Sequence, residues 1–182
     1  IIYPFVYIAI KFDDGGKIFI HQERVGQNNN IIRILKFRTM SVDDEGDGEA
    51  NRALRVTRVG KLLRASRVDE LPQLWNVFRG DISLIGPRPE LPQLVKRYSE
   101  EISYYNVRHL IKPGLSGWAQ IYHDNHPHHG TEVEATREKL SYDLYYIKHR
   151  SLTLDAVVIL KTIKKLLTRS GVDIAVGKDS LR

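Results

Sequence analysis

The chain has no cysteine and only one methionine among its 182 residues. The missing cysteines exclude a disulfide scaffold, a cysteine-ligated zinc site and a thiol nucleophile, and they fit a reducing compartment. No apolar run reaches the ~20 residues that a membrane-spanning helix needs, and the sequence has no internal repeat. Because 42% of the residues are apolar and 27% are charged, a disordered or fibrous chain is excluded, and we expect one domain with a buried core.

Positive charge is in excess, with 28 Lys and Arg residues against 22 Asp and Glu residues, a net charge of +6. A basic surface predicts an anionic partner, which is a nucleic acid, a phosphorylated small molecule or an anionic membrane. Composition does not choose among these three.

The first ten residues are almost entirely apolar and interrupted by Pro4. They follow neither an initiator methionine nor a basic segment, so they do not resemble a signal peptide. One interpretation is a buried strand or helix of the core. The other is the remaining half of a longer apolar segment whose helix is broken at Pro4, and the abrupt start favours this second interpretation.

Turn residues and apolar periodicity divide the rest of the chain and predict an α+β fold, rich in helix, with a small β-hairpin. The expected strands are 17–25 and 31–39, and an acidic loop follows at 41–50. The expected helices are 54–63, 70–78, 94–105, 132–148 and 152–168.

Two segments imitate metal sites. The acidic run at 43–48 resembles the start of a calcium loop but has Leu54 where the bidentate glutamate belongs. Four histidines lie close together in a segment with proline and glycine, which predicts a loop and not a helix face of ligands. They are His123, His126, His128 and His129. We therefore expect no metal at either segment.

Basic residues recur at every third position from Arg52 to Arg67. A step of three drifts around a helix axis, so these side chains form a broad positive flank and not a narrow stripe. By itself, this flank fits a solvated face or a nucleic-acid footprint.

An acidic pair, Asp69 and Glu70, follows the basic flank directly. Pro72 is tolerated only in the first turn of a helix, so we expect a helix with Asp69 as its N-cap and Gly80 as its C-terminal stop. Four apolar side chains at helical spacing predict one buried face. They are Leu71, Leu74, Trp75 and Phe78.

The context of the acidic pair suggests chemistry beyond capping. Two carboxylates beside cations can hold Mg²⁺, and a carboxylate can attack phosphorus as a nucleophile. The loop 86–89 presents Arg88 between two prolines, which suits a bidentate phosphate contact.

These residues resemble the bacterial sugar transferases, the monotopic polyprenyl-phosphate phosphoglycosyl transferases. The similar runs are KFRTM at 36–40, SRVDELPQLWNV at 66–77, SLIGPRP at 83–89, KPGLSGWAQ at 112–120, YDLYYI at 142–147 and SLTLD at 151–155. The resemblance extends over nearly the whole chain, from about position 4 to 167.

The resemblance implies transfer of a sugar-1-phosphate from a UDP-sugar to undecaprenyl phosphate, with release of UMP, as the first membrane step of polysaccharide or glycoconjugate assembly. It implies that Asp69 forms a covalent aspartyl phosphosugar, and that Glu70 assists with Mg²⁺ or with proton transfer. It places four basic residues at phosphate-binding positions, namely Lys36, Arg38, Arg64 and Arg88. Which UDP-sugar is used, which pathway is served and whether the protein is a homo-oligomer stay open.

The same resemblance implies a remnant of a re-entrant membrane helix at 1–12, bent at Pro4, and a catalytic domain at 13–182 on the cytoplasmic face of the bacterial inner membrane. Anionic lipid of the inner leaflet is then a partner. Lys161, Lys164 and Lys165 fall on one face of the last helix, opposite an aliphatic face, which is typical of an interfacial helix. The alternative is an aliphatic face packed on the core of the domain.

One segment departs from the family pattern. Many small members carry an arginine shortly after Trp-Ala-Gln, whereas this chain continues with Ile121, Tyr122 and the histidine loop, as larger members do. We hypothesise that the histidines replace that arginine in substrate binding. The rival functions are a nucleic-acid-binding module, which leaves the acidic pair unexplained and lacks a pattern of stacking aromatics, and a non-catalytic membrane scaffold. We expect no nucleic-acid partner.

Overall fold

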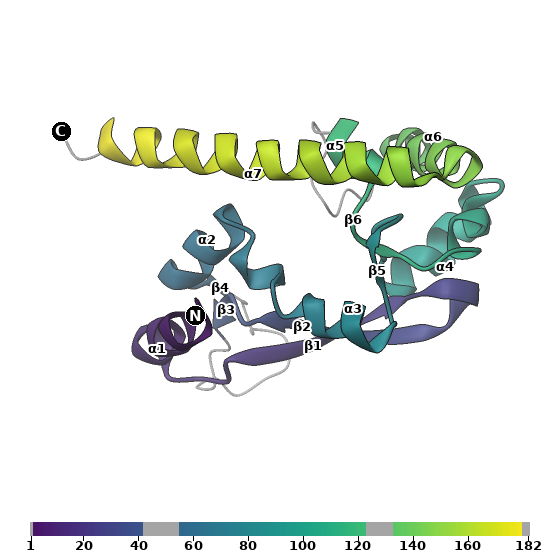
Figure 1. Ribbon diagram of the computed structural model, residues 1–182. Helices are drawn as coiled ribbons and strands as arrows, with labels where there is room; N and C mark the ends of the chain where they lie inside the picture. The colour runs from purple at the N-terminus through teal and green to yellow at the C-terminus, as the bar shows by residue number, and fades with distance from the viewer. Residues whose placement is uncertain (1, 42–54, 123–132, 180–182) are drawn as a thin grey trace. The chain divides into compact units, whose positions relative to one another are not determined.

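The computed structural model describes residues 2–41, 55–122 and 133–179, with side chains described as far as Thr168 (Figure 1). The α-helices are α1 (Ile2–Asp14), α2 (Arg58–Ala65), α3 (Gln73–Arg79), α4 (Pro92–Glu101), α5 (Trp118–Tyr122), α6 (Val133–His149) and α7 (Leu152–Asp179). The strands are β1 (Phe19–Val25), β2 (Ile31–Phe37), β3 (Met40–Ser41), β4 (Arg55–Val56), β5 (Ser83–Ile85) and β6 (Gly114–Ser116). The expected helix-rich α+β class is confirmed.

The strands form small sheets. β1 and β2 pair with each other across the short 3₁₀ turn η1 (Gln27–Asn29), which confirms the expected strand pair. β3 pairs with β4 antiparallel, and β5 pairs with β6 in parallel. The chain divides into two compact units. Unit 1 contains Ile1–His21, Leu35–Gln73 and Leu166–Arg182, and unit 2 contains Gln22–Ile34 and Leu74–Lys165.

The core of unit 1 joins α1 to the end of β2 and to α2. Val6 and Ile10 of α1 pack with Phe37 and Leu63, and the Tyr3 ring lies 5.3 Å from the Phe37 ring, centroid to centroid. Several other apolar side chains of α1 are exposed, among them Phe5, Ile8 and Phe12. In the part of the chain that the structure describes, no helix has both the length and the apolarity to cross a bilayer. Because α1 begins at Ile2, Pro4 lies in its first turn, and a bend at Pro4 stays a prediction.

The predicted start of α2 was wrong. The helix begins at Arg58 and not at position 54, because Arg55 and Val56 pair with β3, Met40 lying opposite Val56. The Thr57 side chain then caps the helix by accepting a hydrogen bond of 2.9 Å from the Gly60 amide. The helical pattern included Arg55 and Val56, but these two residues form β4, whose partner β3 is distant in the sequence.

The predicted start and buried face of α3 were also wrong. Asp69 is no N-cap, since it lies in the separate 3₁₀ turn η2 (Val68–Glu70), and α3 starts at Gln73. Asn76 faces inward and donates hydrogen bonds to the Arg33 carbonyl, 2.8 Å, and to Asp81 Oδ2, 3.0 Å. The aliphatic and aromatic side chains consequently face outward, with exposed fractions of 47%, 55% and 81% for Leu74, Trp75 and Phe78. Gly80, with φ +81°, ends the helix as expected.

Unit 2 is organised by the parallel pair β5–β6. Ser83 lies opposite Gly114 and Ile85 opposite Ser116. A Cβ atom on Gly114 would overlap backbone atoms of Gly86 and Ile85, so this approach requires glycine. Around the pair, α4 ends at Glu101, short of its predicted end, and a 3₁₀ turn η3 (Tyr105–His109) follows.

Helix α7 turns its apolar face outward. Its inward residues include Val158, which is fully buried. Lys161 is exposed, and its Nζ lies 4.2 Å from the centre of the Tyr122 ring. Lys165 Nζ donates a hydrogen bond of 2.9 Å to the Gln120 carbonyl. Lys161 and Lys165 thus contact α5, which the sequence analysis did not predict, and contact of the α7 lysines with lipid headgroups stays a prediction. Leu160 and Ile163 are 67% and 49% exposed, so the alternative of a core-packed aliphatic face is wrong.

Candidate active site

The acidic pair lies in unit 1, immediately after a tight reversal of the chain. Arg67 adopts a left-handed conformation, with φ 54° and ψ 18°, which is uncommon for a residue with a side chain. Its carbonyl accepts the Glu70 amide at 3.2 Å. This turn places Asp69 and Glu70, both half-buried, next to the basic last turn of α2. Backbone strain of this kind often accompanies functional sites.

Lys36 brings a cation to this turn from β2. Its Nζ lies 3.4 Å from Glu70 Oε1, and the two side chains are only 14% and 12% exposed. Partial burial makes such a pair stronger than a surface ion pair, because less water screens it. The resemblance assigned Lys36 to phosphate binding, and that role stays a prediction.

Arg64 is oriented by a buried threonine. Its Nε donates a hydrogen bond of 2.8 Å to Thr39 Oγ1, and Thr39 is 4% exposed. This bond is made by Nε, and the two terminal amino groups of a guanidinium are further donors that suit an anion. Arg64 is exposed on the last turn of α2, in the same unit as the carboxylates.

Arg38 has a different partner. It forms an ion pair with Asp14 at the end of α1, and its guanidinium covers Gly16 so closely that a Cβ there would overlap it. The strand ends at Phe37, and the Arg38 amide donates to the Ile18 carbonyl at 2.8 Å. The structure therefore joins Lys36 to Glu70 but Arg38 to Asp14.

Arg88 belongs to unit 2, where a buried arginine holds its loop. Arg108 Nη2 donates a hydrogen bond of 2.8 Å to the Arg88 carbonyl. Arg108, 3% exposed, also lies 2.8 Å from Asp143 Oδ2 and donates to the Tyr105 hydroxyl at 2.7 Å. The loop that presents Arg88 is thus fixed by interactions beneath it.

The charges of this buried group shift several pKa values. Burial alone would raise the pKa of Glu90, but Lys139 and Arg108 lower it to about 2. Burial raises the pKa of Asp143, and Arg108 opposes that shift. Burial and the charge of Arg108 lower the pKa of His109 to about 4, so this imidazole is neutral at pH 7. Glu90 therefore stays ionised beside Lys139 and Arg108 well below neutral pH.

The acidic pair fits the coordination habit of Mg²⁺, which is bound through one or two carboxylates together with substrate phosphates and water. Within 2–41, 55–122 and 133–168, no three His, Asp or Glu side chains gather as a metal site. The residues therefore suit an ion whose remaining ligands come from substrate. Arg52, the acidic run at 43–48 and the histidine loop lie outside the described residues.

The bacterial sugar transferase family matches residues 1–169. A UDP-N-acetylgalactosamine-undecaprenyl-phosphate N-acetylgalactosaminephosphotransferase of Aeromonas hydrophila is 44% identical over 167 residues, covering 90% of this chain and 38% of the relative. A UDP-glucose:undecaprenyl-phosphate glucose-1-phosphate transferase of Caulobacter vibrioides is 42% identical, covering 88% and 61%.

The chain belongs to the bacterial sugar transferase family. It spans less than two thirds of the length of either of these relatives. The family resemblance that the sequence motifs predicted is confirmed.

In this bacterial sugar transferase, sequence reasoning missed the residues that position the cations. Thr39 lies inside the KFRTM run, which was a local signal, yet its bond to Arg64 spans 25 positions. No local sequence pattern pointed to Asp14 or Arg108 as positioning residues, because their partners Arg38 and Arg88 are 24 and 20 positions away.

Proposed function

We propose that this chain transfers a sugar-1-phosphate from a UDP-sugar to undecaprenyl phosphate and releases UMP, through a covalent intermediate on Asp69. The observation that carries the proposal is the strained turn that holds Asp69 beside Glu70, in one unit with Lys36 and Arg64. The printed names of the Aeromonas and Caulobacter relatives support the substrate classes.

In the first half-reaction, an Asp69 carboxylate oxygen attacks the β-phosphorus of the UDP-sugar. The new bond joins that oxygen to phosphorus, and the bond between phosphorus and the bridging oxygen breaks, so UMP leaves with the electron pair. Carboxylate and diphosphate are both anionic, and phosphoryl transfer depends on positioning and charge neutralisation. Arg64 supplies positive charge to the phosphate oxygens, while Lys36 balances the Glu70 carboxylate.

In the second half-reaction, a phosphate oxygen of undecaprenyl phosphate attacks the same phosphorus. The aspartyl oxygen leaves as a carboxylate, which regenerates Asp69, and the product is a polyprenyl diphosphate sugar. Arg88, in its braced loop, is the further phosphate-binding residue that we assign to this reaction.

Asp69 and Glu70 are the residues that would hold Mg²⁺. When bound, the ion supplies charge neutralisation for the diphosphate and polarises its oxygens. Glu70 keeps its partner Lys36 within 3.4 Å, so this carboxylate is already oriented before a substrate binds.

We further propose that the protein works on the cytoplasmic face of the bacterial inner membrane, at the first membrane step of polysaccharide or glycoconjugate assembly. Support comes from apolar side chains that lie outside the core. Phe5 and Phe12 of α1 are 72% and 89% exposed, and Leu160 of α7 is 67% exposed. Surfaces of this kind mark interaction sites, and a polyprenyl substrate requires contact with a bilayer.

The deciding experiment is UMP release from a panel of UDP-sugars, with and without Mg²⁺ and undecaprenyl phosphate. We expect one or a few UDP-sugars to give release, with multiple turnovers only when the lipid phosphate is present. Release of no UMP from any UDP-sugar, by folded protein in a bilayer with both additions, would exclude this activity.

A further inference from the structure

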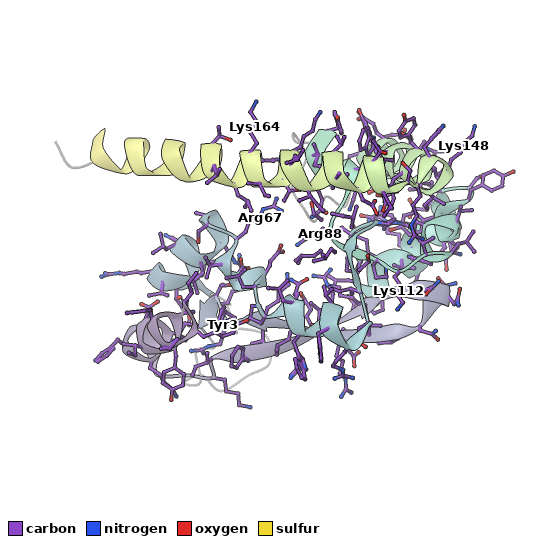
Figure 2. All side chains as sticks on the ribbon, in the orientation of Figure 1. Tyr3, Arg67, Arg88, Lys112, Lys148 and Lys164 are labelled. Atoms are coloured by element: carbon purple, nitrogen blue, oxygen red, sulfur yellow. The ribbon has the colours of Figure 1, made fainter. Side chains whose placement is uncertain are left out.

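The acidic end of α1 contacts the helix that carries Arg64. Asp13 is half-buried, and its Oδ2 accepts a hydrogen bond of 2.9 Å from the Val59 amide. Because Val59 is the second residue of α2, Asp13 caps that helix from 46 positions earlier in the chain. Both helices belong to unit 1, in which Figure 2 labels Tyr3 on α1 and Arg67 just after α2.

Helix α2 depends on such bonds because it is only eight residues long. An isolated helix of about two turns is not stable in water, and its first amides have no partner within the helix. The Thr57 side chain satisfies the Gly60 amide. Asp13 satisfies a second amide, that of Val59, and its negative charge faces the positive end of the helix dipole. The bond to Asp13 therefore helps to keep α2 helical and in place.

The end of α1 is itself fixed, so Asp13 can hold α2 in place. The next residue, Asp14, forms an ion pair with Arg38, and these two side chains are only 18% and 12% exposed. Apolar residues of α1 also share a buried cluster with Leu63 of α2. Asp13 thus joins two helices that already pack together, and its carboxylate sets the N-terminal end of the second one.

The effect of the cap can reach Arg64 through the short helix. Arg64 lies five positions after Val59, which is less than two helical turns. Its hydrogen bond of 2.8 Å to Thr39 Oγ1 requires the last turn of α2 to stay against Thr39. Gly60 permits this close approach, because a Cβ atom there would overlap the Thr39 carbonyl. A loosened N-terminus of α2 would therefore move Arg64 away from the acceptor that orients it.

We infer that Asp13 is a positioning residue for the reaction proposed above. By capping α2, it holds Arg64 where the guanidinium stabilises the negative charge on the phosphate oxygens in the transition state. The inference rests on the proposed function, because the role of Arg64 belongs to that reaction. It also gives α1 a task besides the contact with lipid that we propose for this helix.

The first experiment is a double-mutant cycle that measures UMP release by the full chain in bilayer discs. Asp13→Ala removes the acceptor, and the loss of a cap bond predicts a fall in kcat of about fivefold, with the KM for the UDP-sugar unchanged. In the Arg64→Ala background we expect Asp13→Ala to lower kcat no further, because the group through which it acts is absent. Asp13→Asn keeps an oxygen that can accept the same bond and should restore the rate.

The matched control is Glu100→Ala, which removes a carboxylate from an exposed position of α4 in unit 2 and should leave kcat unchanged. An equal loss of kcat in both backgrounds would overturn the inference, because Asp13 would then stabilise the fold without acting through Arg64. A wild-type kcat in Asp13→Ala would overturn it as well.

Hydrogen–deuterium exchange tests the cap without any substrate. We expect Asp13→Ala to speed exchange of the backbone amides at 58–65, and Asp13→Asn to keep the wild-type exchange rate. Exchange in the β5–β6 pair of unit 2 is the internal reference. If the wild-type protein released no UMP, the proposed function would fail, and this measurement would still decide whether Asp13 holds α2. Unchanged exchange at 58–65 in Asp13→Ala would overturn the inference.

Discussion

Asp69 is the residue at which loss of chemistry can be separated from loss of binding. Asp69→Asn keeps the size of the side chain and the turn made by Arg67, but an amide is a poor nucleophile and leaving group. We expect no turnover and no protein-bound phosphosugar by intact mass spectrometry, with binding of the UDP-sugar retained. UMP release at the wild-type rate from this variant would refute the covalent route.

Arg64 and Thr39 test charge stabilisation together. Arg64→Ala should reduce kcat by roughly 10²–10³, the cost of losing one donor to a developing oxyanion. Thr39→Val removes only the acceptor of the 2.8 Å bond, so we expect a smaller loss, about tenfold. Thr39→Ser restores the hydroxyl and should restore the rate, and failure of this rescue would mean that Thr39 acts through packing alone.

For individual residues, the sequence was a better guide to those that take part in the reaction than to those that hold them in position. Asp69, Glu70 and Arg64 lie within seven positions, so their proximity follows from a single turn. The contacts Lys36–Glu70, Arg38–Asp14 and Arg108–Asp143 join distant positions, and only the folded chain determines them. Two basic residues spaced two apart, Lys36 and Arg38, accordingly have different partners.

Among the helices and strands, α7 allows the most specific prediction, which concerns its contact with lipid. Leu160→Glu combined with Ile163→Glu should weaken flotation with anionic liposomes at least tenfold, since each aliphatic group removed from the acyl region loses about 1.5 kcal/mol or more. Gln93→Glu, on an exposed position of α4, is the control for added charge. Unchanged flotation of the double variant would show that α7 does not contact lipid.

The lysines of α7 should behave differently. Lys161→Glu and Lys165→Glu remove contacts to Tyr122 and to the Gln120 carbonyl. We therefore expect them to lower the thermal unfolding temperature, and not only the salt-sensitive part of membrane binding. A differential scan of both variants, in detergent and without lipid, checks this effect.

Periodicity predicted the approximate places of α2, α3, α4, α6 and α7, but it predicted neither α5 nor which helix faces are buried. In α3 and α7 the apolar stripe was expected to face protein or to oppose free cations. Instead, Asn76, Val158 and Lys165 face the protein, and Phe78 and Leu160 face outward. A helical pattern states that two faces differ in polarity, and only the tertiary contacts decide which of them is turned inward.

For the whole molecule, the buried charges of unit 2 predict how stability depends on pH. The Glu90 pKa falls from 4.5 to about 2 on folding, so its contribution, about 3 kcal/mol, is fully present above pH 4.5 and is lost as the pH falls toward 2. The His109 pKa falls from 6.5 to about 4. Because the unfolded imidazole takes up a proton first, His109 also destabilises the fold as the pH falls below 6.5.

The Glu90 and His109 shifts both make the free energy of unfolding decline on acidification, whereas the raised pKa of Asp143 makes a contribution of the opposite sign. Urea titrations at several pH values measure this free energy. Glu90→Gln should flatten the decline below pH 4.5, and His109→Phe should flatten it between pH 6.5 and 4. A pH dependence that is the same in both variants as in the wild-type protein would contradict the assignment of these groups.

The close approach of Gly114 to Gly86 also limits how far this chain can diverge. In a library with every amino acid at position 114, the smallest side chain, alanine, would already overlap backbone on both strands, and backbone cannot rotate away as a side chain can. Neighbouring Leu115, which is half-buried, would accept many replacements. After selection for folded protein, we expect only glycine at position 114 and many residue types at position 115. Sequencing of the selected library would then reveal the close contact of β5 with β6.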